Sequence, residues 1–279
     1  MSCQLSIVGV GPQRSGTTWL YECLRHHPQL YLPDGVKETF FFDQRFDRGW
    51  QWYWSHFPRP EGRRLVEVAP TYFDVSESAD RIHAHNPECR VVVTLRDPAE
   101  RSFSLYLHHR RKGRLECEFP DAIDRMPRIL DSSRYRRHIH RWRERFGPER
   151  VHVILLDDIA KDPLAVLRGF YRFADLQEVA PPPGAHQRIN AGGVAASRQL
   201  ARWAWKVAHW LRERRLYQAV DLARQLGFRR VYGSDGARLP ELPADERAKL
   251  IGLFEEDIAY VEELLGRPLP EWRRVETPA

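Results

Sequence analysis

The most distinctive chemistry in the sequence lies near the N-terminus, in the segment VGPQRSGTTWL from Val10 to Leu20. Gly11 and Gly16 have the spacing of a Walker A loop, which binds phosphate through backbone N–H groups at the start of a helix. That motif requires lysine where this chain has Thr17, and Arg14 instead places a positive charge inside the loop. Because the missing lysine is the group that reaches the β- and γ-phosphates, the segment predicts an anion site without triphosphate chemistry. A turn with a purely structural role is the alternative.

A second cationic side chain, Arg96, directly follows the apolar run VVVTL. Open α/β sheets bind their ligands beyond the carboxyl ends of the strands, so a guanidinium at this point suits a second anionic group. Two anion sites at neighbouring strand ends predict a ligand with phosphate-type groups at both ends. Pairing of Arg96 with a nearby carboxylate is the alternative.

These residues need a scaffold, and the sequence predicts an α/β fold with a central parallel sheet of the P-loop type, flanked by helices. Short apolar segments at 5–10, 63–73, 89–98 and 151–156 are typical of buried parallel strands, and helical patterns separate them. We interpret residues 1–279 as one domain.

Two helices have clear sequence signals. Asp97 is expected as the N-cap of a helix that begins at Pro98, with Glu100 completing a capping box. Residues 243–266 predict one final amphipathic helix. Between these regions, Pro181 to Gly184 form a break, and a basic, tryptophan-rich helical stretch follows at 195–215. That stretch is expected to pack over an acceptor cleft, with a membrane interface as the alternative.

The composition limits the classes of ligand that the protein is expected to bind and the compartment in which it is expected to lie. The net charge is +6 and the pI is about 9.3, which favours anionic ligands without selecting one. Four well-separated cysteines imply neither a zinc site nor a disulfide framework, and the paired histidines lack the spacing of a helical zinc site. The N-terminus lacks the pattern of a signal peptide, and no segment is apolar for eighteen residues. We expect a cytoplasmic protein without stable membrane insertion.

Several segments together resemble a known family. PQRSGTTWL resembles the 5′-phosphosulfate loop of sulfotransferases that use 3′-phosphoadenosine 5′-phosphosulfate (PAPS), and VVVTLRDPAERSFSLYLHHRRKG resembles their 3′-phosphate motif. KETFFFD, WQWYWSHFP and LVEVAPTYF are similar to segments of the carbohydrate branch of that family, the heparan sulfate type. LLDDIAKDPLAVLRGFYRFADL and DIAYVEELLGRPLPEW extend the likeness, in the same order, over most of the chain.

The resemblance implies roles for the residues that hold the donor. Arg14, two residues before Gly16, stands in the place of the family's loop lysine, which acts on the bridging oxygen, and arginine stabilises charge there without lending a proton. Arg96 and Ser104 would bind the 3′-phosphate. Trp19 would stack on adenine, unless it is a core residue. The 5′-phosphate would be held by Ser15, Gly16, Thr17 and Thr18. No metal is implied.

The resemblance also implies a base, Glu38 in KETFFFD, which takes the proton of the acceptor hydroxyl, and Lys37 beside it would contact the transferring sulfonate. Glu67 is the competing carboxylate, and a solvent-facing Lys-Glu pair is the alternative for Lys37 and Glu38. Arg188 could close over the nucleotide.

The whole pattern predicts a sulfotransferase that moves a sulfuryl group from PAPS to a hydroxyl of a carbohydrate or small-molecule acceptor, including secondary metabolites, by in-line displacement. A phosphotransferase and a non-catalytic nucleotide- or glycan-binding module are the alternatives. No nucleic-acid partner is expected, and the sequence leaves the oligomeric state open.

Overall fold

The computed structural model describes residues 4–182, 184–185 and 240–275. Within these ranges a five-stranded sheet forms the centre, with the strand order β2-β3-β1-β4-β5 and every neighbouring pair parallel. Its strands are β1 (Leu5–Val10), β2 (Leu30–Tyr31), β3 (Arg64–Val68), β4 (Arg90–Leu95) and β5 (Val151–Leu155). The predicted α/β fold and its four strand segments are therefore confirmed. The fifth strand, β2, has only two residues, which is too short for a sequence pattern.

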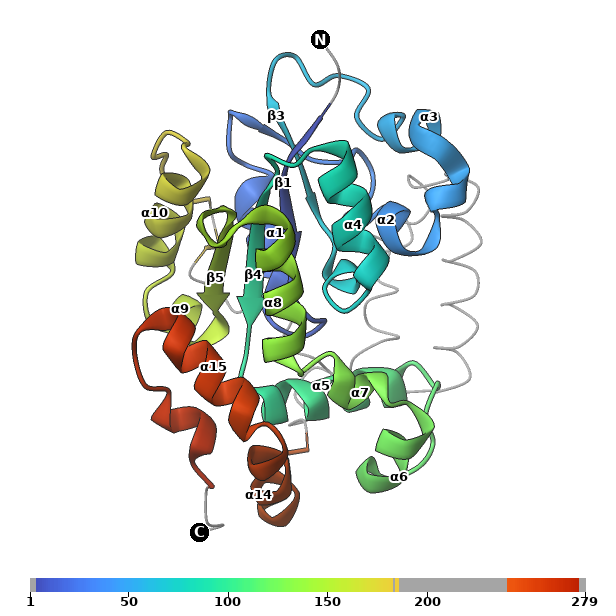
Figure 1. Cartoon of the computed structure of the whole chain (residues 1–279), viewed down its shortest axis with the longest axis vertical. Helices are drawn as coiled ribbons and strands as arrows, with labels where there is room; N and C mark the ends of the chain where they lie inside the picture. The colour runs from blue at the N-terminus through green and yellow to red at the C-terminus, as the bar shows by residue number, and fades with distance from the viewer. Residues whose placement is uncertain (1–3, 183, 186–239, 276–279) are drawn as a thin grey trace.

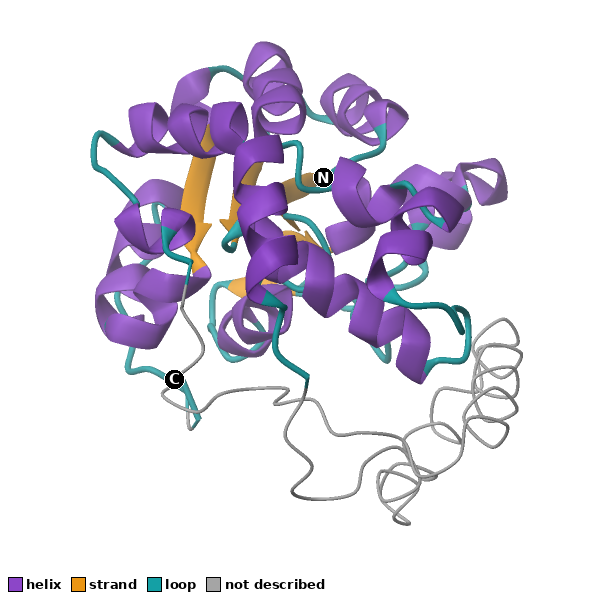
Figure 2. Ribbon diagram, turned by 90° about the horizontal axis from the view of Figure 1, so that it is seen from below, coloured by secondary structure: helices purple, strands orange, loops and turns teal. Residues whose placement is uncertain are grey.

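Helices cover both faces of the sheet (Figures 1 and 2). Those in the described residues are α1 (Thr17–Leu24), α2 (Phe41–Gln44), α3 (Gly49–Trp54), α4 (Ser76–His85), α5 (Pro98–Arg111), α6 (Phe119–Arg125), α7 (Arg128–Asp131), α8 (Tyr135–Phe146), α9 (Leu156–Lys161), α10 (Pro163–Ala174), α14 (Ala244–Leu253) and α15 (Glu255–Leu265). Short 3₁₀ turns lie at Phe46–Arg48, Pro70–Tyr72, Pro148–Arg150 and Pro270–Arg273. None of the described helices is long and apolar enough to cross a membrane.

The alternation of side chains along the strands divides the core into two layers. In β4, Val91 and Val93 pack with buried residues of α4 and α8, whereas Val92 packs on the opposite face with α1 and α10. This is the arrangement expected when both faces of a parallel sheet are covered by helices. The labelled strands of Figure 1 run in the same direction, and β4 leads into α5. Because every neighbouring pair is parallel, the carboxyl ends of the strands share one edge.

The final amphipathic segment forms two helices, so the prediction of one continuous helix is wrong. α14 ends before Phe254, whose backbone leaves the helical region with φ −104° and ψ 11°. The Phe254 side chain is fully buried in the core, and the break allows α14 to pack on α5 while α15 packs on α8. Burial of one large aromatic side chain thus overrides the helical periodicity.

Candidate active site

The loop between β1 and α1 has the backbone of a phosphate-binding turn. Gly11 and Gly16 adopt φ values of +130° and +102°, and a Cβ on Gly11 would lie only 2.5 Å from the Thr94 carbonyl oxygen of β4. Only glycine fits both demands at Gly11, a left-handed backbone and close contact with the neighbouring strand. The predicted order of strand, loop and helix is confirmed, and the loop N–H groups lie at the positive end of α1.

Ser15 stabilises this loop from within. Its buried hydroxyl donates to the Pro12 carbonyl at 2.6 Å and lies 2.9 Å from the Thr94 hydroxyl. A role of Ser15 toward the 5′-phosphate therefore falls to its backbone N–H rather than to its side chain, and it stays a prediction.

Arg14 connects the loop to α5. Its backbone has φ +77°, and its Nε donates to Ser104 Oγ at 3.1 Å, so two residues ninety positions apart in sequence meet at the carboxyl edge of the sheet. Burial, and then the charges of Arg111 and Arg96, lower the pKa of Arg14 to about 10. Arg14 remains protonated at neutral pH, and the repulsion among three guanidinium groups favours an anionic ligand.

Arg96 makes the ion pair that the sequence allowed as its alternative role. It lies 3.0 Å from Glu100, one helical turn into α5. Asp97 caps this helix as predicted, accepting from the backbone N–H groups of Ala99 and Glu100. The Glu100 carboxylate, expected to complete the capping box, instead pairs with Arg96 and with Arg247 of α14. Two ion pairs, a local one with Arg96 and a long-range one with Arg247, thus take the place of the capping contact.

Lys37 and Glu38 lie beside the phosphate loop, although twenty residues separate them from it. Lys37 Nζ is 3.3 Å and 3.4 Å from the hydroxyls of Thr17 and Thr18, and 3.4 Å from Glu38 Oε1. Burial raises the pKa of Glu38, against the opposing charges of Lys37 and Lys112. Burial likewise lowers the pKa of Lys37, against the charge of Glu38. Lys37 is thus turned toward the loop, and both side chains of the pair are mostly covered rather than facing open solvent.

Glu67, the competing carboxylate, is fully buried and has several donors around it. Oε1 accepts from the backbone N–H of Thr39 at 2.8 Å, from the Thr39 hydroxyl at 2.6 Å and from the Tyr72 hydroxyl at 3.1 Å. Oε2 accepts from the Tyr53 hydroxyl at 3.0 Å. These contacts favour a role in positioning over that of a base, because a base needs an open approach to the acceptor.

Burial raises the pKa of Glu67 to about 7, partly offset by the hydrogen bonds of Thr39, Tyr53 and Tyr72. The folded state thus holds a proton that the unfolded state releases near pH 4.5, so stability from this group falls as pH rises from about 4.5 to 7. The loss of stability is on the order of 3 kcal/mol.

Glu67→Gln, which cannot titrate, should therefore gain stability relative to the unmodified protein as the pH is raised from 5 to 8. Urea unfolding of both proteins at the two pH values measures this difference, and an unchanged difference would contradict the expected titration.

Trp19 lies in the core. Its side chain is 4% exposed, packs in the layer formed by α1 and α10, and donates its indole N–H to the Ala185 carbonyl at 2.9 Å. This is the packing alternative considered for Trp19, because a ring enclosed by core side chains offers no free face for stacking on adenine.

Sequence reasoning missed the C-terminal end of α5 as part of the site. The charge of Arg111 contributes to the lowered pKa of Arg14, and the charge of Lys112 opposes the rise that burial causes in the pKa of Glu38. Burial, with the charges of Lys112 and Arg14, lowers the pKa of His108 to about 2, so this imidazole is neutral. The signal was the run HHRRK, which lies at the end of the segment that resembles the 3′-phosphate motif and closes a helix that begins two residues after Arg96. Arg188 and residues 195–215 lie outside the described residues.

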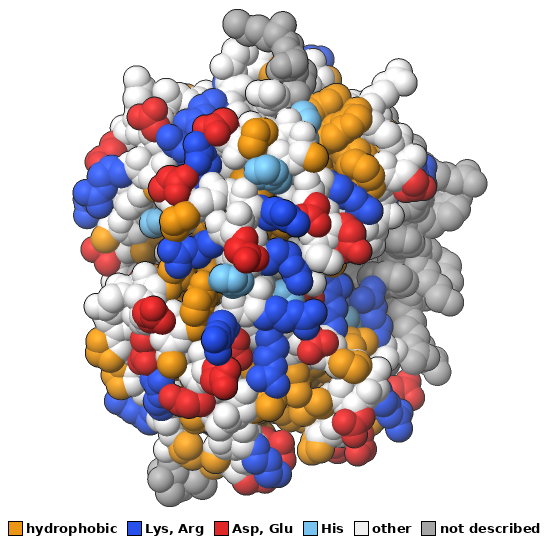
Figure 3. All heavy atoms as spheres, viewed as in Figure 1, with side chains coloured by type: hydrophobic (Ala, Val, Ile, Leu, Met, Phe, Trp, Pro, Cys, Tyr) orange, Lys and Arg blue, Asp and Glu red, His pale blue; other side chains and the backbone are white. Residues whose placement is uncertain are grey.

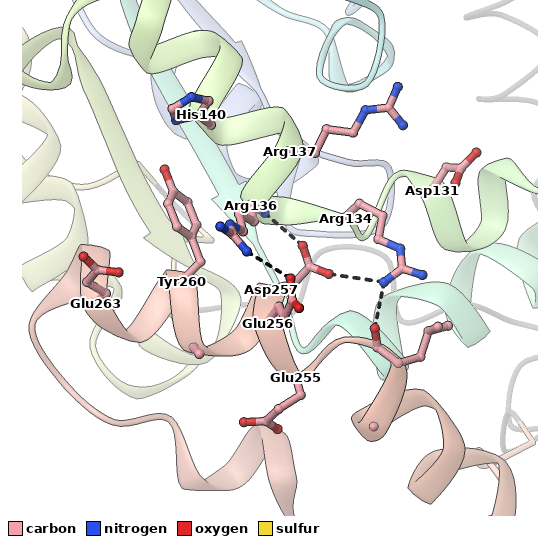
Figure 4. Close-up of a pocket in the computed structure, with 13 residues that line it drawn as sticks. Asp131, Arg134, Arg136, Arg137, His140, Glu255, Glu256, Asp257, Tyr260 and Glu263 are labelled. Carbon is pink, nitrogen blue, oxygen red and sulfur yellow. Dashed lines mark hydrogen bonds and ion pairs between the residues drawn. The ribbon is translucent and has the colours of Figure 1, made fainter.

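The rest of the described surface gives less indication of a ligand. Positive and negative side chains are interspersed over the face seen in Figure 3, so no single basic patch dominates it. A groove of about 1020 Å³ lies between α8 and the α14–α15 pair (Figure 4). Its charges are largely paired, Arg134 with Asp257 and Arg136 with Glu256, and none of the predicted site residues lines it.

Known proteins with similar sequences and structures can now be compared with this geometry. The chain is 29% identical over 214 residues to the bifunctional heparan sulfate N-deacetylase/N-sulfotransferase 1 of Caenorhabditis briggsae, covering 66% of this chain and 25% of that protein. It is 26% identical over 292 residues to the corresponding enzyme 3 of Homo sapiens, covering 96% of this chain and 31% of that protein. It thus spans a quarter to a third of the length of these relatives.

A solved sulfotransferase from Alicyclobacillus acidocaldarius has the same fold, with a TM-score of 0.70 and 21% identity over 98% of this chain and 100% of that one. The family model of the sulfotransferase domain matches residues 6–187, which is more than half of the chain. The chain therefore belongs to the sulfotransferase family of enzymes.

Proposed function

We propose that this sulfotransferase moves a sulfuryl group from PAPS to a hydroxyl group of a carbohydrate or small-molecule acceptor by in-line displacement. The observation that carries the proposal is the position of Lys37, which contacts the hydroxyls of Thr17 and Thr18 as well as Glu38. A carboxylate is thereby held beside a phosphate loop. Transfer to a weakly nucleophilic hydroxyl requires this arrangement.

The donor would supply the activated sulfuryl group, and the basic residues of the site fit its anionic ends. The loop N–H groups suit the 5′-phosphate, and Arg96 with Ser104 suits the 3′-phosphate. The Ser104 hydroxyl accepts a hydrogen bond from Arg14 and keeps its own proton to donate to a phosphate oxygen. An anion at this point would also offset the repulsion among Arg14, Arg96 and Arg111.

On the acceptor side, Glu38 accepts the proton of the attacking hydroxyl as the new oxygen–sulfur bond forms. Lys37 lies between Glu38 and the loop, so its ammonium is placed to neutralise the sulfonate oxygens during transfer. Arg14 stabilises the negative charge that develops on the phosphate oxygen as the bond to sulfur breaks. The three side chains thus act on the nucleophile, the transferred group and the leaving group.

The relatives support a carbohydrate acceptor, because both are named as heparan sulfate N-deacetylase/N-sulfotransferases. Since that name specifies transfer to nitrogen, a sugar amino group is the second acceptor to examine. Incubation with sulfur-labelled PAPS and a cell extract, followed by identification of the labelled product, distinguishes the two. Turnover of a nucleoside triphosphate with magnesium would instead support a phosphotransferase.

Removal of Arg96 should identify the donor. The protein is expected to bind adenosine 3′,5′-bisphosphate much more tightly than adenosine 5′-monophosphate, and Arg96→Ala should remove most of this difference. Loss of a charge-assisted hydrogen bond costs about 1.5–3 kcal/mol, or roughly one to two powers of ten in affinity. Titration calorimetry with both nucleotides measures it.

Two further variants control this experiment. Glu100→Gln removes the carboxylate that pairs with Arg96 and should not weaken bisphosphate binding. Arg25→Ala removes an arginine that pairs with Glu22 on the surface of the molecule, and it should leave both affinities unchanged. Equal affinities of the unmodified protein for the two nucleotides would exclude the assigned 3′-phosphate site.

A further inference from the structure

We infer that Glu67 is a positioning residue for the proposed base: its buried carboxylate fixes Thr39, and Thr39 fixes the orientation of Glu38. The inference rests on the proposed function of Glu38. Glu67 belongs to strand β3, whereas Glu38 belongs to the loop before α2. The contact therefore fastens the loop to the sheet, which positions a side chain more exactly than a loop does.

The backbone N–H, the hydroxyl and the carbonyl of Thr39 all have hydrogen-bond partners. Both its backbone N–H and its hydroxyl donate to the same oxygen of Glu67, at 2.8 Å and 2.6 Å, and its carbonyl accepts from Arg45 at 3.2 Å. Thr39 is 1% exposed, whereas Glu38 immediately before it is partly exposed. The chain is thus fixed at the residue next to the one that must meet the acceptor.

The segment also contains a backbone conformation that needs support. Phe40 has φ +58° and ψ 25°, a left-handed conformation that is uncommon for a bulky residue and costs on the order of 1–3 kcal/mol. On the far side of Phe40, the Tyr72 hydroxyl accepts from the N–H groups of Phe41 and Phe42, at 2.9 Å and 3.3 Å, and donates to Glu67. Glu67 therefore holds the strained residue from both sides, directly through Thr39 and indirectly through Tyr72.

The hydrogen-bond chemistry suggests which substitutions are informative. In Glu67→Gln the amide oxygen can replace Oε1, and the amide N–H can donate to the Tyr53 hydroxyl, which also accepts. This variant should therefore preserve the segment and most of the transfer activity. Thr39→Val keeps the shape and the backbone N–H but removes one of the bonds to Glu67, whereas Thr39→Ser keeps that bond.

A double-mutant cycle tests whether these residues act through Glu38. Thr39→Val should lower kcat for an aliphatic hydroxyl by roughly tenfold or more, because small misplacements of a reacting group are costly. Donor KM should change little, and Thr39→Ser should restore the rate. In a Glu38→Gln background, Thr39→Val should cause less than about a twofold further loss, since coupled residues are not additive. Ser132→Ala, which removes another buried hydroxyl bond at the end of α7, is the matched control.

Two results would overturn the inference. If Thr39→Val lowers kcat by the same factor with and without Glu38, the hydrogen bonds between Glu67 and Thr39 do not act through Glu38. If Glu67→Gln abolishes transfer while donor affinity is intact, Glu67 itself accepts the proton and is the base.

Hydrogen exchange gives a readout that does not depend on activity. The buried Thr39 amide should exchange slowly in the unmodified protein and markedly faster in Glu67→Ala, with the amides of β4 unchanged. Faster exchange at Thr39 in a protein that transfers no sulfuryl group to any acceptor would support the contact while refuting the proposed function. Unchanged exchange in a folded Glu67→Ala variant would refute the contact. If that variant does not fold, the cycle at Thr39 still decides.

Discussion

Glu38→Gln should lower transfer to an aliphatic hydroxyl by about two to four powers of ten while donor binding survives. The amide keeps the volume of the carboxyl group and can still accept a hydrogen bond from Lys37, but it cannot take the acceptor's proton. Because Lys37 also contacts Thr17 and Thr18, the loop should stay in place in this variant. Rates with labelled PAPS, together with calorimetry of adenosine 3′,5′-bisphosphate, separate the two effects.

The pattern across acceptors distinguishes a base from a residue that only positions substrate. An acidic phenol gives up its proton more easily. The rate of transfer to 4-nitrophenol should therefore fall much less in Glu38→Gln than the rate of transfer to an aliphatic alcohol. Asp43→Asn is the matched control, since it makes the same chemical change in the same KETFFFD segment. Near-normal turnover in Glu38→Gln, combined with no turnover in Glu67→Gln at intact donor affinity, would show that Glu67 is the base.

The pH dependence of the rate should point to the same group. Burial raises the pKa of Glu38, so the residue becomes protonated, and unable to act as a base, at a higher pH than an ordinary glutamic acid. Turnover should therefore decrease as pH falls through this raised pKa. The decrease should disappear in Glu38→Gln.

The sequence predicted the sheet well because buried parallel strands leave continuous apolar runs. VVVTL at β4 and LSIVGV at β1 are of this kind, and glycines then mark the loop that follows β1. The break at Phe254 could not be predicted in the same way. Its cause is the burial of one ring in a core assembled from distant helices, and the local periodicity carries no trace of that.

In the candidate site, too, local features could be predicted from the sequence and long-range contacts could not. Arg14, Arg96 and Glu38 could be named from their motifs, because each motif is local. The bond from Arg14 to Ser104 and the position of Lys37 over the loop join segments that are distant in sequence, and only the fold brings them together. The contacts of Glu67 could not be predicted either. Tyr53 in α3 and Tyr72 in the turn after β3 both lie in segments that resemble the family, but only the fold shows that their hydroxyls meet at this carboxylate.

Arg14→Ala should reduce turnover by roughly two to three powers of ten, the typical cost of removing one group that stabilises developing negative charge. Binding of the product nucleotide should weaken much less, because the interaction becomes strongest in the transition state. The comparison requires kcat with labelled donor and calorimetry of adenosine 3′,5′-bisphosphate. Arg25→Ala controls for loss of one positive charge, since Arg25 follows α1 and pairs with Glu22 on the surface.

Arg14→Lys makes the sharper comparison, because lysine is the usual residue of the family that the loop resembles. Both side chains carry the charge at neutral pH, so the lysine variant should retain substantial activity. Lysine begins from a lower ordinary pKa than arginine, and the same burial and the same charges of Arg111 and Arg96 would lower it further. The activity of Arg14→Lys should therefore decline at a lower alkaline pH than that of the unmodified enzyme. A folded Arg14→Lys protein that binds the nucleotide but is inactive at neutral pH would show that the geometry of the guanidinium, including its bond to Ser104, matters more than its charge.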